Sequence, residues 1–166
     1  MFTTVHLHLL LNHLPIIITA LALALLAVAA LRRNDTIART GLAFLVGAAL
    51  SALPTYLTGG GAEEAVEKLP GVTEALIESH EEIALIAALV VGALGVVALF
   101  GFWRYRQPVR VPSAFILTLL AGSIAGAGLM GYTGLLGGRI RHTEARPGYV
   151  APTEALPDAG GDRERE

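Results

Sequence analysis

Four long apolar stretches constrain this chain more than any other feature. They run roughly over residues 5–31, 36–57, 82–103 and 112–136, and they are rich in Leu, Ala, Val and Ile with almost no charge. A helix of about 20 mostly apolar residues crosses a bilayer core, and a helix satisfies its own backbone hydrogen bonds in lipid. The sequence therefore predicts an all-α integral membrane protein, a bundle of four spanning helices.

The composition agrees with a membrane protein and excludes several other classes. Hydrophobic residues make up 54% and charged residues 16% of the 166 residues, whereas soluble domains carry about 25% charged residues. The net charge of −2 is too small to favour nucleic acid as a partner. The sequence contains no cysteine, which excludes disulfides, thiolate metal sites, iron–sulfur clusters and cysteine nucleophiles.

The basic residues predict how the chain is oriented. No Lys or Arg precedes the first span, which indicates a retained anchor rather than a cleaved signal peptide. The short connections carry six basic residues near span ends, namely Arg32, Arg33, Arg39, Arg104, Arg106 and Arg110. The other side carries four, namely Lys68, Arg139, Arg141 and Arg146. Because basic residues near span ends favour the cytoplasm, we expect a multi-pass protein of the cytoplasmic (inner) membrane with both termini external, in the periplasm.

The polar segments define the remaining organisation. The external loop between spans two and three, residues 58–81, contains two short amphipathic stretches, 62–69 and 72–79, which predict short helices. The four-span domain covers residues 1–143, and the tail 144–166 is rich in Pro, Gly and charge, which predicts disorder. We predict no internal repeat.

The residues most suited to chemistry are five histidines. They are His6, His8, His13, His80 and His142, and all five fall at the external end of the predicted bundle. His13 lies about 10 Å deeper along the first span than His6, at 1.5 Å per residue. Ionisable groups at membrane depth need partners and are functional candidates.

Two short motifs resemble a known family. The first span opens on a His-x4-His-x-Pro pattern between His8 and Pro15, and the fourth span is followed by Gly-Gly-Arg-Ile at 137–140. These resemble the His-Pro-x-x-x-His-Phe-Pro-like opening and Gly-Gly-x-Leu-like ending of bacterial membrane proteins grouped as domain of unknown function 2231. Leu9 and Leu14 depart from the family's usual proline and phenylalanine. The resemblance implies a four-helix membrane protein with a distant likeness to haem-bearing b-type cytochromes, and it supplies no established activity.

The first hypothesis is a haem b site for electron transfer. Such a site needs two imidazoles from different helices, and His13 with His80 is the predicted pair, with His142 as a substitute for His80. Small residues four apart, such as Gly122 and Gly126, allow helices to approach closely or leave room for a flat cofactor. Two arginines suit the propionates, because the guanidinium fork matches a carboxylate; they are Arg139 and Arg141.

The second hypothesis is a non-haem metal site at the external face. Imidazole and carboxylate ligands together suit zinc, iron or copper and do not select among them. The candidate ligands are His13, His80, His142, Glu63, Glu81 and Glu144.

The third hypothesis is an accessory or scaffold subunit that binds no cofactor. His6 and His8 then act as interfacial hydrogen-bonding residues. The sequence lacks the glycine, serine and phosphate-binding motifs of common enzymes, so an electron-transfer or accessory protein is favoured over a stand-alone enzyme. The partners expected are the lipid bilayer, a redox partner or larger membrane complex, and a second copy of the chain.

Overall fold

The protein is a helical bundle, seen in a computed structural model that describes residues 3–151. Every regular element in this range is helical. Of the tail 144–166, which was predicted to be disordered, residues 152–166 lie outside the described residues. The elements in chain order are α1 (Thr4–Leu11), α2 (Leu14–Arg32), α3 (Asp35–Leu57), α4 (Gly59–Val66), α5 (Glu74–Arg104), α6 (Ser113–Arg141) and the 3-10 turn η1 (Thr143–Ala145).

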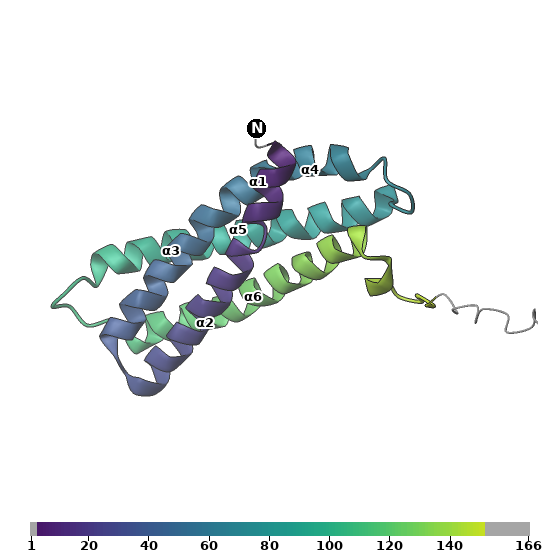
Figure 1. Ribbon diagram of the computed structural model, residues 1–166. Coiled ribbons are helices and arrows are strands. Elements are labelled where there is room, and N and C mark those ends of the chain that lie inside the picture. The colour runs from purple at the N-terminus through teal and green to yellow at the C-terminus, as the bar shows by residue number, and fades with distance from the viewer. Residues whose placement is uncertain (1–2, 152–166) are drawn as a thin grey trace, which may run out of the picture.

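Four candidate membrane spans confirm the predicted architecture. They are α1 with α2, α3, α5 and α6, each long and apolar enough to cross a membrane. The helices α2, α3, α5 and α6 lie side by side, and the short α2–α3 and α5–α6 connections lie together at one end (Figure 1). We call the opposite end, which holds α1, α4 and η1, the terminal end.

The third span begins earlier than predicted, at Glu74 rather than near residue 82. The predicted short helix 72–79 is therefore the first part of α5. Glu74 lies in the first turn, where a negative charge interacts favourably with the helix dipole. Ile77 is buried, so this polar extension also has an apolar contact face.

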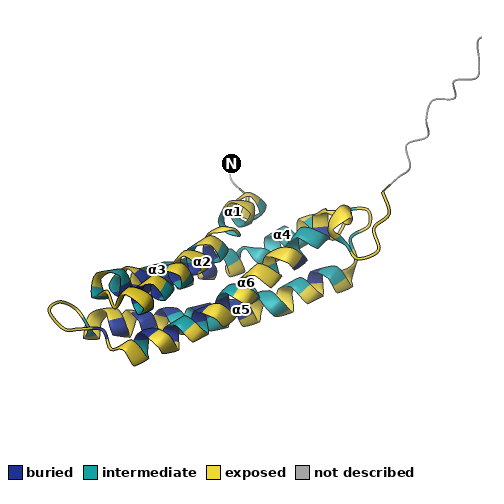
Figure 2. Ribbon diagram, turned by 90° about the horizontal axis from the view of Figure 1, so that it is seen from below, coloured by how far each residue is buried: buried dark blue, intermediate teal, exposed yellow. Residues whose placement is uncertain are grey.

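The first span is broken between α1 and α2. Pro15 has no backbone N–H, so it cannot donate to the carbonyl of Leu11. The Thr55 hydroxyl of α3 lies 3.3 Å from that carbonyl oxygen, although its one hydrogen has a nearer acceptor in the Ser51 carbonyl at 2.8 Å. The break lets α1 leave the bundle axis (Figure 2) and pack on α4, where Gly61 allows close contact with Thr4.

Small residues bring the spans together. A side chain at Gly122 would meet Leu94 at 2.6 Å, and one at Gly126 would meet Leu94 at 3.2 Å and Val91 at 3.5 Å. The small-residue face of α6 is therefore occupied by packing against α5 and leaves no room there for a flat cofactor. The space for a ligand lies elsewhere, at the terminal end.

Candidate cofactor site

A cavity of about 700 Å³ opens at the terminal end of the bundle. Its volume falls within the range of about 300–1,000 Å³ typical of small-molecule and cofactor sites. The first span, α3, α4, α5 and α6 all contribute to its wall, and many of the lining residues are Ala, Gly, Leu or Ile. Four of the five histidines line it, namely His8, His13, His80 and His142.

His8 is held by the end of α3. Its Nδ1 lies 3.0 Å from the Thr55 carbonyl oxygen and 3.4 Å from the Thr58 hydroxyl. A carbonyl only accepts, so Nδ1 carries the hydrogen and donates it, and Nε2 of the neutral ring keeps its lone pair. The Thr55 carbonyl lies in the last turn of α3, which ends at Leu57, and the last four carbonyls of a helix lack backbone partners within it. The Thr58 hydroxyl also lies 3.0 Å from its oxygen, and a carbonyl oxygen has two lone pairs.

His80 is held in the same way by α6. It is half-buried on α5, and its Nδ1 donates to the Thr133 carbonyl at 3.0 Å. The ring packs against Gly137, where an added Cβ would lie 3.0 Å from Cε1 and 3.3 Å from Nδ1. His80 therefore also presents an unprotonated Nε2 while Nδ1 is anchored to a backbone carbonyl, the arrangement typical of metal-ligating histidines.

His13 lines the cavity without such an anchor. It lies at the break between α1 and α2, its side chain is exposed, and no hydrogen bond to its ring is found among residues 3–151. The neighbouring Asn12 also lines the cavity, and its Oδ1 is buried with no hydrogen-bond partner in the same range. The predicted pair of His13 and His80 thus shares one cavity, but only His80 has a fixed ring.

His142 lies at the mouth of the cavity. Its Nδ1 is 2.9 Å from the Glu144 carboxylate, and both side chains are largely exposed, at 64% and 60%. The pKa of Glu144 is held below its usual value, first by its own backbone N–H and then by His142. His142 therefore lines the same cavity as His80, but its ring is held by an exposed carboxylate and not by a backbone carbonyl.

The comparison with protein families agrees with a membrane protein over most of the chain. A family model described as "Predicted membrane protein (DUF2231)" matches residues 4–144. The chain belongs to this family. None of the curated proteins and none of the solved structures matches it. The DUF2231 family description names a membrane protein and no activity, so any function must be argued from the site.

Three arginines near the end of α6 have different positions in this DUF2231 protein. Arg141 lines the cavity. Arg139 does not line it, and its Nε is buried without a hydrogen-bond partner among residues 3–151. Arg146 has a structural role that was not predicted from the sequence. It donates to the carbonyls of Arg139, Ile140 and Gly71 at 2.8, 3.0 and 2.7 Å, which ties the chain after α6 to the loop before α5.

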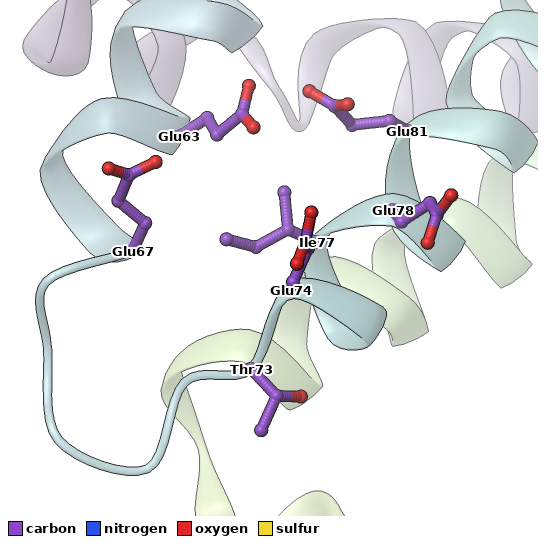
Figure 3. A pocket seen from close by; sticks show the side chains of 7 residues that line it. All are labelled: Glu63, Glu67, Thr73, Glu74, Ile77, Glu78 and Glu81. Carbon is purple, nitrogen blue, oxygen red and sulfur yellow. The ribbon is translucent and has the colours of Figure 1, made fainter.

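Two carboxylates form part of the cavity wall. Glu63 of α4 and Glu81 of α5 point toward each other (Figure 3) and also line an outer acidic pocket of about 410 Å³. The pKa of Glu63 is raised, first by a hydrogen bond with Glu81 and then by the charge of Glu81. A carboxyl beside another carboxyl loses its proton less readily because two negative charges repel.

The six predicted metal ligands do not gather around one point. Among residues 3–151, no group of three or more His, Asp or Glu is placed to hold a metal ion. Glu63 pairs with Glu81, and His142 pairs with Glu144. Within the described range, the arrangement that fits a ligand consists of two anchored imidazoles rather than a mixed cluster.

His8 was predicted to be an interfacial residue, and no internal repeat was predicted, but the ends of α3 and α6 carry the same short motif. Thr55–Gly60 and Thr133–Gly138 share the pattern Thr-x-Leu-x-Gly-Gly. Each pattern begins with the threonine whose carbonyl holds one of the two anchored histidines. Aligning the ends of α3 and α6 would have found the repeat, but its role depends on which histidine each carbonyl meets in space.

Proposed function

We propose that this protein binds haem b in the cavity at the terminal end and carries electrons at the membrane surface. The observation that supports this most is the pair of anchored imidazoles, His8 and His80, on one cavity. They come from different helices, and each has Nδ1–H fixed on a carbonyl. Haem bound by two imidazoles supplies a one-electron carrier with no open coordination position.

The remaining groups of the cavity fit the same ligand. Its wall offers small and aliphatic side chains for an apolar ring, and Arg141 offers a guanidinium for a carboxylate. His8 replaces His13 in the proposed pair because its ring is already oriented, and pre-oriented ligands bind at lower entropic cost.

The proposed setting is the cytoplasmic membrane of a bacterium. The excess of basic residues on the short connections supports a cytoplasmic location for that end and a periplasmic location for the cavity. A redox partner, alone or within a larger membrane complex, would then meet the protein at the terminal end.

The test is an optical spectrum of the full chain, expressed with added haem precursor and purified in detergent. We expect a Soret band and a sharp α-band after reduction with dithionite, and both bands should be lost in His8→Ala and in His80→Ala. His6→Ala, on the same short helix, should keep them. A wild-type protein without a Soret band overturns the proposal.

Two further outcomes separate the alternatives. Loss of the bands in His13→Ala but not in His8→Ala would return His13 to the pair. Stoichiometric zinc, iron or copper without haem, measured by elemental analysis of the same preparation, would instead favour a non-haem metal protein. A preparation with neither would favour the accessory-subunit hypothesis.

A further inference from the structure

The Thr-x-Leu-x-Gly-Gly repeat places a glycine four residues after each anchoring threonine. In an α-helix the carbonyl of one residue points toward the residue four positions later. The side chain of that later residue leans back over the preceding turn and so stands beside the carbonyl. A glycine there leaves the carbonyl open to a donor from another helix, which is how His80 reaches Thr133 beside Gly137.

The glycines of the two repeats differ in how closely they approach the histidine rings. A Cβ at Gly137 would lie at 3.0, 3.3 and 3.7 Å from Cε1, Nδ1 and Nε2 of His80. A Cβ at Gly59 would lie 4.0 Å from Cε1 of His8, which is ordinary contact. Of the two rings, only that of His80 lies so close to the glycine that an added methyl group would require it to shift by a few tenths of an ångström.

We propose that Gly137 is the positioning residue of the cofactor site, acting through His80. Without a side chain it uncovers the Thr133 carbonyl and admits the ring, and these two effects fix the proton on Nδ1 and direct Nε2 into the cavity. This inference rests on the proposed haem function for its consequence, but the orientation of the ring is a property of the protein without ligand.

Gly138 supplies a matched control. It lies on the same turn of α6, and an added Cβ there meets nothing within 4 Å. Replacing either glycine by alanine raises helix propensity by a similar amount, about 1 kcal/mol. A difference between the two variants therefore reports on the contact with His80 and not on the helix.

The first measurement needs no haem. In protein labelled with ¹⁵N-histidine, the ring nitrogens of His80, assigned through His80→Ala, should report the Nδ1–H tautomer. Gly137→Ala should change those shifts, whereas Gly138→Ala should leave them as in the wild type. Equal spectra for both variants would overturn the inference, whatever the protein binds.

The second measurement follows haem binding. Gly137→Ala should weaken haem affinity by about 10–100-fold, the usual effect of losing a group that orients a metal ligand, and should convert a low-spin signal to high-spin in electron paramagnetic resonance. Gly131→Ala should bind as the wild type does, because an added Cβ at Gly131, also on α6, meets nothing within 4 Å and Gly131 does not line the cavity. Added imidazole should restore the low-spin signal in Gly137→Ala, and in a His80→Ala background Gly137→Ala should have no further effect.

The outcomes distinguish the two proposals. Haem binding by the wild type with equal affinities for Gly137→Ala and Gly131→Ala would leave the proposed function standing and remove the role of Gly137. Absence of haem from the wild type, together with a tautomer change only in Gly137→Ala, would remove the proposed function but keep the role of Gly137 in positioning His80. Loss of folding in Gly137→Ala alone would be detected by its unfolding curve. The tautomer of His80 in the wild type then decides, because a ring protonated on Nε2 would overturn the inference and an Nδ1–H ring would support it.

Discussion

At the residue scale, the carboxyl pair of Glu63 and Glu81 makes stability depend on pH. The pKa of Glu63 is raised in the folded protein by Glu81, so the folded state holds that proton more tightly than the unfolded state. Protonation of Glu63 therefore contributes its whole stabilising effect below the ordinary carboxyl pKa, and this contribution is lost as pH rises through the raised pKa. We expect the unfolding temperature to fall as pH rises from the ordinary carboxyl pKa of about 4.5 through the raised value, and the fall to be smaller in Glu81→Gln.

Glu78→Gln provides the control for this prediction. Glu78 lines the same outer pocket but points away from the pair (Figure 3), so its loss should leave the pH dependence of unfolding nearly unchanged. Thermal unfolding of the detergent-solubilised protein at several pH values measures the difference. Equal pH profiles for wild type and Glu81→Gln would show that the two carboxyl groups do not share a proton.

The residues of the site were only partly predictable from the sequence. His80 was expected because it precedes an apolar span, where an imidazole needs a partner. His8 was not, since its anchor is a carbonyl released by the end of α3, far away in the chain. The availability of a backbone carbonyl depends on where a helix ends, and the sequence predicts helix ends less well than helices.

At the element scale, Arg146 connects segments that are distant in the chain. Its three hydrogen bonds reach the end of α6 and the loop before α5 through Gly71. Hydrogen bonds to charged groups contribute about 1.5–3 kcal/mol net, so Arg146→Ala should lower the free energy of unfolding by about 2 kcal/mol. Arg146→Lys should recover little of this, because an ammonium group lacks the fork of donors that reaches several carbonyls.

Equilibrium unfolding in mixed detergent micelles measures this loss. Arg141→Ala is the control, since Arg141 is an exposed arginine on the same helix end. The loop before α5 should also be cut faster by protease in Arg146→Ala. An unfolding free energy equal to that of the wild type would mean that the hydrogen bonds of Arg146 do not hold the loop.

The long elements were predictable, and their junctions were not. Apolar length alone located the four spans, because a bilayer fixes how many apolar residues a helix needs. The break between α1 and α2 was visible only as Pro15, and the packing of α1 on α4 that follows from it joins segments far apart in the chain. The start of α4 at Gly59 also differs from the predicted 62–69, because three glycines extend a helix here instead of ending one.

At the scale of the whole molecule, the proposed function depends on which side of the membrane the cavity faces. The α2–α3 and α5–α6 connections lie at one end of the bundle and the cavity at the other. Locating either end on one side of the membrane therefore locates the other end on the opposite side. The excess of basic residues on the connections favours the cytoplasm for them. A redox partner would then approach from the periplasm.

The absence of cysteine makes this orientation directly measurable with single-cysteine variants. Lys68→Cys, in the loop before α5, should react with a membrane-impermeant maleimide in intact cells whose outer membrane is permeable to the reagent. Gln107→Cys, in the α5–α6 connection, should react only after the inner membrane is opened. The reverse pattern would place the cavity in the cytoplasm, where any electron donor or acceptor would have to be a cytoplasmic protein or a cytoplasmic domain of a membrane complex.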